Sequence, residues 1–154
     1  MKSIADLLAD HEFFAGLEPA DVEFLSGCGQ NVRFPAGATV FSEADPAEHF
    51  YVLREGKVAL EVHVPDAGAI VIATLGAGEV LGASWLFPPF RWQFDALAVT
   101  DTAAVALDAA CLRQKCDADP RLGYALVQRF AALLVERLQA TRLRLVDLYG
   151  GGEP

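Results

Sequence analysis

The chain is short of basic residues, with 12 Lys and Arg against 21 Asp and Glu and a formal net charge of −9. A protein that binds nucleic acid must neutralise phosphates with basic side chains, and a net negative field opposes that approach. No apolar run reaches the roughly 20 residues that span a bilayer, and the first ten residues lack the pattern of a signal or transit peptide. We therefore expect a cytoplasmic protein that contacts neither nucleic acid nor a membrane directly.

Cysteine is also scarce. Cys28, Cys111 and Cys116 are an odd number of thiols in a chain without a secretion signal, so we expect them to be reduced. Only Cys111 and Cys116 lie close in sequence, and no third or fourth metal ligand accompanies them. The sequence predicts no zinc or iron–sulfur site.

Between residues 31 and 107, short β-branched and aromatic runs alternate with turn residues. The predicted strands are 31–34, 39–42, 50–54, 58–64, 70–75, 94–100 and 102–107. Many short strands at even spacing indicate a β-sandwich or barrel. In 57–64 the residues alternate, which predicts that Val58, Leu60, Val62 and Val64 face the core, opposite a solvated face of Lys57, Ala59, Glu61 and His63.

Helices are predicted on both sides of these strands. Ser3 can cap a first helix, and Pro19 opens a second that ends near residue 27. Asp108 can cap a short helix through residue 115, and Pro120 fits the first turn of a long helix that ends at Gly150. At 1.5 Å per residue, a helix of about 28 residues is roughly 40 Å long, more than a domain of this size can cover.

The long helix carries two apolar stripes. The first, which we call the seam stripe, has the alternating steps of four and three residues that a coiled coil requires: Val127, Ala131, Leu134, Leu138, Thr141, Leu145 and Leu148. The second, the core stripe, consists of Leu126, Phe130 and Leu133, which could face the strands. A helix that is apolar on two sides needs two partners, so we predict a homodimer through this helix. The alternative is one broad buried face in a monomer.

This order of parts resembles the cyclic-nucleotide-binding domain of the catabolite-activator (Crp/Fnr-like) family over nearly the whole chain. The stretch 78–91, Gly-Glu-Val-Leu-Gly-Ala-Ser-Trp-Leu-Phe-Pro-Pro-Phe-Arg, resembles that family's phosphate-binding cassette. The stretch 136–141, Glu-Arg-Leu-Gln-Ala-Thr, looks like the segment that touches the purine.

The resemblance implies a mainly β fold with α-helices, a double-stranded β-helix (jelly roll) flanked by N-terminal helices and a long C-terminal helix. It implies one domain over residues 1–154, with N-terminal helices in 1–28, the roll in 29–107 and C-terminal helices in 108–149. Members that regulate transcription continue into a helix-turn-helix, whereas this sequence stops at 150–154, Gly-Gly-Gly-Glu-Pro. We expect any effect on transcription to pass through a protein partner, whose identity the sequence does not give.

The resemblance also implies a ligand site. Amide groups of Ala83 and Ser84, after Gly82, would attract a phosphate, and the guanidinium of Arg91 would complete the cradle. The predicted ligand-binding residues are therefore Gly82, Ala83, Ser84, Arg91, Trp92 and Thr141. The ligand implied is cyclic AMP or cyclic GMP.

Each assignment has a plain structural alternative. Arg91 could be a surface arginine stacked between Phe90 and Trp92. Thr141 could be a tolerated polar residue in the seam stripe.

Two departures from the family pattern bear on the ligand. The family usually places Glu directly after the cassette glycine, where its carboxylate accepts the ribose hydroxyl, and here that position is Ala83. The segment 85–92, which we call the aromatic loop, holds Trp85, Leu86, Phe87, Pro88, Pro89, Phe90 and Trp92. This loop could fold down as a lid over the pocket or line a pocket for a less polar ligand.

The sequence offers little chemistry for catalysis. There is no Gly-x-Ser-x-Gly elbow, and no base is paired in sequence with a cysteine. His11, His49 and His63 fall on a predicted helix and two strands, and only His49 is near the barrel mouth, which leaves a jelly-roll metalloenzyme as the rival of another class. We expect no enzyme, no catalytic residue, no metal and no cofactor. The predicted function is a regulatory, ligand-sensing module that signals through its dimerising helix, and the alternative is a ligand-free interaction module with an occluded pocket.

Overall fold

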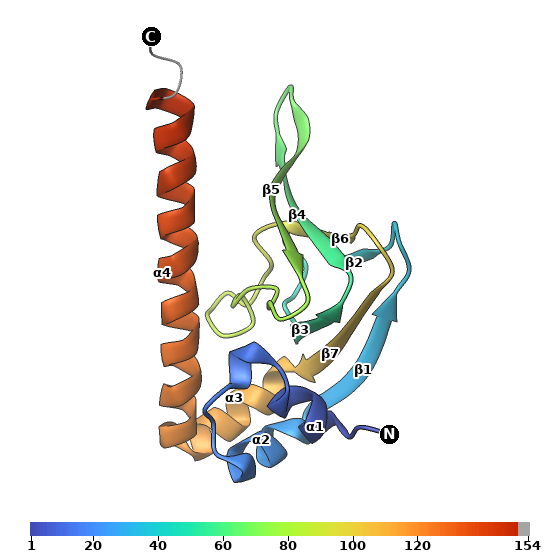
Figure 1. Cartoon of the computed structure of the whole chain (residues 1–154), viewed down its shortest axis with the longest axis vertical. Coiled ribbons are helices and arrows are strands. Elements are labelled where there is room, and N and C mark those ends of the chain that lie inside the picture. Colours follow the sequence, from blue (N-terminus) through green and yellow to red (C-terminus); the bar gives the residue numbers. More distant parts are fainter. Residues whose placement is uncertain (151–154) are drawn as a thin grey trace.

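The computed structural model describes residues 1–150 and places helices at both ends of a β-roll (Figure 1). The elements are α1 (Ile4–Ala9), η1 (Glu12–Phe14), α2 (Pro19–Ser26), β1 (Gly29–Phe34), β2 (Thr39–Phe41), β3 (His49–Glu55), β4 (Lys57–Val64), β5 (Gly68–Gly76), β6 (Asp95–Ala98), β7 (Thr102–Asp108), α3 (Ala109–Ala118) and α4 (Pro120–Gly150). The predicted mainly β jelly roll with flanking helices is confirmed, and each predicted strand overlaps an observed one.

The strands form two antiparallel sheets, ordered β1-β7-β3 and β2-β6-β4-β5. The turn between β3 and β4 shows why a glycine is needed between these two strands. Gly56 has a φ of +90°, and a Cβ there would collide with the carbonyl oxygen of Asp101. Only glycine therefore lets the β3–β4 turn pass so close to the start of β7.

The predicted alternation along β4 holds for half of the strand. Val58 and Leu60 are buried, but Ala59, expected on the solvated face, is also buried, and Val64, expected in the core, is exposed. The distal part of the β4–β5 hairpin projects beyond the roll (Figure 1), where no second layer covers it. The register of β4 against β5 also shifts between Leu60 and Glu61, so strict alternation does not continue through the strand.

The helix ends follow the predicted caps. The hydroxyl of Ser3 accepts a hydrogen bond of 3.1 Å from the amide of Asp6 at the start of α1. Pro19 stands in the first turn of α2. At the start of α3, the Asp108 carboxylate accepts a hydrogen bond of 2.8 Å from the amide of Cys111. The Ser3 and Asp108 side chains satisfy N–H groups that a helix leaves free, and Pro19 has no N–H to satisfy, so all three helix starts could be predicted from the sequence.

Aromatic side chains form two clusters on opposite faces of the sheet that contains β3. Phe50 points toward the helices, where Phe13, Phe14, Trp85 and Phe130 surround it with ring centroids 4.8–6.5 Å apart. The neighbouring Tyr51 points the other way, into the roll, in the cluster of Phe34, Phe41, Tyr51, Trp92 and Phe94. We call the second set the roll cluster.

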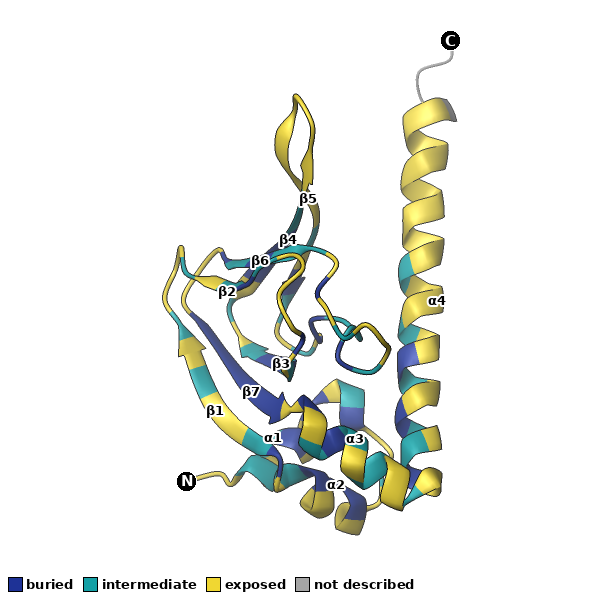
Figure 2. Cartoon of the chain, turned by 180° about the vertical axis from the view of Figure 1, so that it is seen from behind, coloured by how far each residue is buried: buried dark blue, intermediate teal, exposed yellow. Residues whose placement is uncertain are grey.

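The helix α4 has one buried and one exposed apolar stripe. Leu126 and Phe130 of the core stripe are buried against the roll and Leu133 is half-buried, as predicted. The seam stripe is exposed, with Leu134 at 50% and Leu138 at 63%. Figure 2 shows that burial on α4 is confined to the half that lies beside α3 and the roll.

The expectation of three reduced thiols is wrong for two of them. Cys28 and Cys111 form a disulfide with Cα atoms 5.7 Å apart, while Cys116 is a free, half-buried thiol. The pair is 83 residues apart in sequence, so spacing gave no signal. Pairing of Gly29 with Leu107 in the β1–β7 ladder brings the start of α3 beside Cys28.

Candidate functional site

The cassette begins as an extended segment held against β3. The amide of Gly78 donates a hydrogen bond to the carbonyl of Leu53, and the amide of Leu53 donates one to the carbonyl of Glu79. The amide of Leu81 donates a third to the carbonyl of Tyr51, and all three are 2.9–3.1 Å long. The carboxylate of Glu79 accepts a hydrogen bond of 2.7 Å from the amide of Gly76. Glu79 is therefore engaged in the turn before the cassette.

Gly82 is where the chain leaves this extended path. Its φ of +102° is one that L-residues rarely adopt. A Cβ at Gly82 would lie 3.3 Å from Cζ of Phe94 and 3.9 Å from the Trp92 ring. Two members of the roll cluster thus stand directly against Gly82.

The amides of Ala83 and Ser84 follow, and both residues are half-buried. Within residues 1–150, neither amide donates to a protein group, while the carbonyl of Ala83 accepts from the amide of Leu86 at 2.9 Å. Two free amides in succession after a glycine are what an anion site needs. Both amides are thus unused by the described part of the protein, and their binding of a phosphate stays a prediction.

The aromatic loop folds back onto the protein. The side chain of Trp85 is fully buried, stacked on Phe50 with ring centroids 5.1 Å apart and set edge-on to Phe130 at 5.6 Å. Trp92 at the other end is 3% exposed and stacks on Phe41 at 3.7 Å. The loop is therefore packed against the protein through its two tryptophans, and its role as a lid or as a pocket wall stays a prediction.

An arginine on α3 fastens this loop. Nη1 of Arg113 donates a hydrogen bond of 2.6 Å to the carbonyl of Trp85, and the guanidinium lies 4.3 Å from the centre of the Phe90 ring. Nε1 of Trp85 is buried and has no hydrogen-bond partner in the described part of the chain. The loop is thus held through its backbone and its rings.

Arg91 lies at the rim of the roll. Its Nη1 donates a hydrogen bond of 2.8 Å to the carbonyl of Ala44, and its backbone forms a β-bridge with Pro46. The side chain is exposed. Its guanidinium therefore contacts the turn after β2, while the amides of Ala83 and Ser84 lie at the other end of the loop.

Thr141 lies on the exposed part of α4. Its hydroxyl donates a hydrogen bond of 2.9 Å to the carbonyl of Arg137 one turn earlier. Its hydroxyl hydrogen is thus already used within the helix. The prediction that Thr141 touches a ligand stays untested.

Arg137 is the residue that the sequence did not single out. Its Nη2 donates a hydrogen bond of 2.9 Å to the carbonyl of Val80, so α4 contacts the cassette backbone directly. Burial lowers the pKa of Arg137, and the nearby Glu79 carboxylate opposes that shift. The spacing could have revealed it, since Arg137 follows Phe130 and Leu133 by seven and four residues and so continues the core stripe.

A buried histidine supports the turn before the cassette. His11 accepts a hydrogen bond of 3.1 Å at Nδ1 from the amide of Phe13 and donates one of 3.0 Å from Nε2 to the carbonyl of Leu53. Burial lowers the pKa of this imidazole. Both nitrogens are occupied, so His11 acts as a neutral structural link between η1 and β3.

Comparison with known sequences identifies the family. Residues 31–119 match the family described as Cyclic nucleotide-binding domain. The chain belongs to the cyclic nucleotide-binding domain family.

Relatives in this family are similar along most of the chain. The "CRP-like cAMP-activated global transcriptional regulator" of Mycobacterium tuberculosis is 30% identical over 143 residues, which are 93% of this chain and 62% of that protein. A solved structure from Geobacter metallireducens GS-15 has a TM-score of 0.78 at 26% identity, covering 90% of this chain and 99% of that one. The N-terminal domain of a transcriptional regulator from Streptomyces coelicolor A3(2) has a TM-score of 0.70 at 29% identity, covering 88% and 95%.

The Mycobacterium and Streptomyces proteins are named as transcriptional regulators, and the Geobacter protein is named for cyclic-nucleotide binding. Among residues 1–150, no three His, Cys, Asp or Glu side chains are grouped so that they could hold a metal ion. None of the helices in that range combines the length and apolarity of a bilayer-spanning segment. The chain spans less than two thirds of the Mycobacterium relative, so the activity of that whole protein is not carried over.

Proposed function

We propose that this chain is a non-catalytic regulatory module that works as a homodimer through α4 and whose cassette is occupied by its own aromatic side chains. The observation that carries the proposal is the position of Phe94 and Trp92 against Gly82. The two rings thus lie within 4 Å of a Cβ placed on the glycine that directly precedes the Ala83 and Ser84 amides, and we infer that they restrict the space for a phosphate there. One of them, Trp92, is locked in a stack with Phe41.

The contacts of Arg91 support the same conclusion. A guanidinium dominates a phosphate site through charge-assisted hydrogen bonds. Here it is bonded to Ala44, and the position after the glycine is Ala83, which has no carboxylate to offer a ribose. A cyclic nucleotide would therefore meet neither of the two side-chain contacts that usually add most to its affinity.

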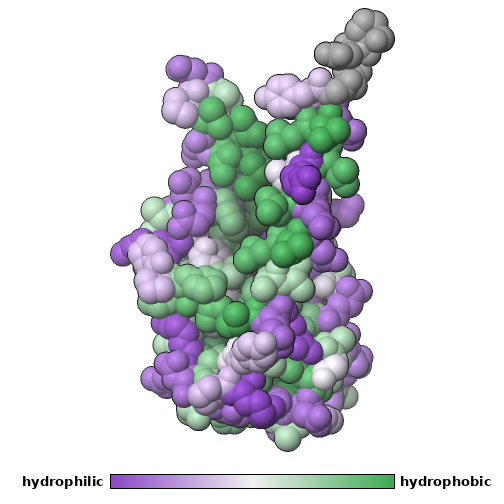
Figure 3. Space-filling view, turned by 90° about the vertical axis from the view of Figure 1, so that its left-hand side faces the viewer, coloured by the Kyte–Doolittle hydropathy of each residue, from purple (hydrophilic) through white to green (hydrophobic). Residues whose placement is uncertain are grey.

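The dimer proposal is supported by apolar surface on α4. Exposed apolar side chains on its distal half include Leu134, Leu138, Leu145 and Leu148, and the β4–β5 hairpin adds Ile70, Val71 and Ile72. Figure 3 shows these apolar groups gathered on the two projecting arms of the molecule. Exposed apolar side chains gathered in this way favour an interaction site, and the seam spacing fits a second copy of the same helix.

The proposed partners follow from the net charge of the chain and from the relatives to which it is similar. The net charge of −9 opposes direct contact with nucleic acid, so an effect on transcription, as in the named relatives, would pass through a protein partner. The proposed location is the cytoplasm.

A second candidate function is a sensor for a small anionic ligand such as cyclic AMP or cyclic GMP. The two free amides after Gly82 favour it, because they are unused by the protein within residues 1–150. Binding in this mode requires Phe94 and Trp92 to move and Arg91 to leave Ala44.

A thermal-shift titration separates the two functions. The nucleotide-stripped protein is titrated with cyclic AMP, cyclic GMP and cyclic dinucleotides beside Arg91→Ala and the matched control Arg33→Ala, an exposed arginine on β1. Ligand bound only by the folded state raises Tm in a saturating manner. The occluded module predicts no such rise in any of the three proteins.

The sensor predicts a saturating rise in the parent and in Arg33→Ala that is lost in Arg91→Ala, and this result would overturn the occluded cassette. When the parent protein shows no rise, Phe94→Ala tests the cause of occlusion. Removing the ring opposite Gly82 should allow a nucleotide-dependent rise that the parent protein lacks.

A further inference from the structure

The helix α3 contacts three other parts of the molecule, which are α4, α2 and the aromatic loop. It packs against α4, and Cys116 on α3 lies against Gly123 on α4. Lys115 donates a hydrogen bond to the carbonyl of Phe24 in α2 and lies 4.5 Å from that ring. Arg113 holds the aromatic loop. A change in how α3 is anchored would therefore reach the loop.

The covalent part of that anchor is the Cys28–Cys111 disulfide. Cys28 lies between α2 and β1, and Cys111 is in the first turn of α3. Beside the disulfide, the amide of Asp108 donates a hydrogen bond of 2.8 Å to the carbonyl of Cys28. The two segments thus keep a backbone contact when the disulfide is open, which makes a local response possible without loss of the fold.

The disulfide borders a cavity, although Cys28 itself is only 8% exposed. This cavity of about 230 Å³ is lined by Cys28 and by residues that include Gly27, His49 and Asp108. On the other side, Cys111 is half-buried rather than enclosed. The third thiol is a poor participant, because burial, with the charges of Asp117 and Asp119, raises the pKa of Cys116.

We propose that Cys28 and Cys111 are a thiol–disulfide modification site, exchanged with small-molecule thiols and disulfides, whose state sets how firmly α3 holds the aromatic loop. In the opening direction a small thiolate attacks one sulfur, forms a mixed disulfide with it and releases the other cysteine as a thiolate that takes up a proton. A second thiolate then displaces the remaining cysteine. The protein gains two electrons and two protons, and two small thiols become one small disulfide.

The link from the disulfide to the loop is short. Arg113 follows Cys111 by two residues on the same helix, and its guanidinium holds both the Trp85 carbonyl and the Phe90 ring. With the bond open, α3 retains the Asp108 cap but loses its covalent tie to α2. The Arg113 contacts then depend on a helix that is held less firmly, so the loop should loosen first.

The protein carries its own reporters of this effect. Its two tryptophans, Trp85 and Trp92, both lie in the aromatic loop and are buried. The full chain is measured oxidised and after reduction with dithiothreitol, by free-thiol titration, by Tm, and by tryptophan emission and acrylamide quenching. The parent is compared with Cys28→Ser/Cys111→Ser and with the matched control Cys116→Ser.

Reduction should raise the thiol count by two and lower Tm by about 5–10 °C, as expected for opening a long covalent loop. It should also shift tryptophan emission to longer wavelength and increase quenching well below Tm. Cys116→Ser should respond as the parent does, and the double variant should match the reduced parent with no further change. In Arg113→Ala, reduction should still lower Tm, but the tryptophan emission should be the same in the oxidised and the reduced protein.

Three results would overturn the proposal. An unchanged thiol count means that no disulfide is present. A lower Tm with unchanged emission and quenching below Tm means that the disulfide only stabilises the fold. A full emission response in Arg113→Ala means that the signal does not travel through α3. None of these results bears on whether a nucleotide binds the cassette, which the thermal-shift titration decides.

Discussion

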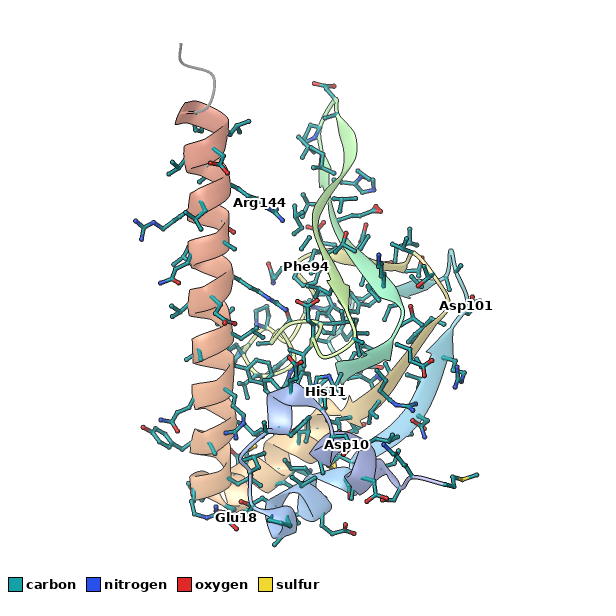
Figure 4. The ribbon with its side chains drawn as sticks, in the orientation of Figure 1. Asp10, His11, Glu18, Phe94, Asp101 and Arg144 are labelled. Atoms are coloured by element: carbon teal, nitrogen blue, oxygen red, sulfur yellow. A yellow bond between two sulfur atoms is a disulfide. The ribbon has the colours of Figure 1, made fainter. Side chains whose placement is uncertain are left out.

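Arg137 on α4 donates a hydrogen bond of 2.9 Å to the carbonyl oxygen of Val80, which places the proposed dimerising helix in direct contact with the cassette. Further along, Nη1 of Arg144 donates a hydrogen bond of 3.0 Å to the carbonyl of Ile72, and Figure 4 shows this side chain reaching from α4 toward β5. Two arginines that lie seven residues, or about two turns, apart on α4 thus donate hydrogen bonds to the backbone on either side of the β5–cassette turn. Any movement of the β5–cassette turn must therefore break these hydrogen bonds or move α4 with it.

The substitution Arg137→Gln should lower stability and loosen the cassette. A hydrogen bond from a charged donor in a half-buried site contributes on the order of 1–2 kcal/mol, so Tm should fall by roughly 2–8 °C. Hydrogen exchange at residues 78–84 should also become faster. Arg142→Gln is the matched control, because Arg142 is exposed on the same helix and should leave both measurements unchanged.

His11 should make stability depend on pH near neutrality. Burial lowers the pKa of its imidazole below the ordinary 6.5, so the folded state favours the neutral form. Its contribution is complete above pH 6.5 and is lost as pH falls from there through the lower folded-state pKa, because the unfolded chain binds the proton first. Tm should therefore drop between pH 7.5 and 5.5.

The histidine assignment is checked by substitution. His11→Gln should have a lower Tm at pH 7.5 and a weaker dependence on pH over that range. His63→Gln provides the control, since His63 is exposed on the β4–β5 hairpin. A parent slope that survives in His11→Gln and disappears in His63→Gln would refute the assignment.

The strands and helix ends were predictable from sequence because local chemistry decides them. Ser3, Pro19 and Asp108 satisfy or replace free helix N–H groups, and glycines such as Gly56 permit turns closed to other residues. The core stripe of α4 was predictable for the same reason, since the helical period fixes which residues share a face.

The site was harder to predict because it depends on contacts between distant segments. The composition of the aromatic loop indicated that its tryptophans are buried but not where. The rings that Trp85 and Trp92 contact belong to residues of β3, α4 and β2. The contact of Arg91 with Ala44 and the Cys28–Cys111 bond likewise join residues 47 and 83 positions apart. Such pairs follow from sheet register, which no short motif specifies.

The ion pair between α2 and α4 should stabilise the protein only above acidic pH. Arg121 donates hydrogen bonds of 3.0 and 2.8 Å to the two carboxylate oxygens of Asp21, whose side chain is 11% exposed. These bonds hold the pKa of Asp21 below its usual 3.8, so the contribution is present above that pH and is lost as pH falls through the folded-state value.

Asp21→Asn should accordingly lower Tm by a few degrees at pH 7 and reduce the loss of stability between pH 4 and pH 2. Asp10→Asn is the comparison, because its pair with Lys2 at 2.7 Å is exposed on both sides and such pairs contribute little. Equal losses in the two variants would mean that the geometry at Asp21 has no special effect.

The seam stripe of α4 should control the oligomeric state. Leu134→Gln/Leu138→Gln removes two exposed leucines from the predicted coiled-coil seam, and because both are solvent-exposed in the single chain, the fold should survive while the dimer dissociates. Light scattering after size exclusion should give twice the chain mass for the parent and the chain mass for the variant. Circular dichroism and Tm report whether the monomer stays folded.

The matched control is Leu143→Gln, which removes an equally exposed leucine from α4. At 100° per residue Leu143 projects roughly opposite the midpoint of Leu134 and Leu138, so its loss should leave the mass at that of a dimer. Dissociation by Leu143→Gln with no effect of the double variant would move the interface to the other side of α4. A parent protein with the mass of one chain would remove the dimer from the proposed function, since the exposed seam would then have no second copy to cover it.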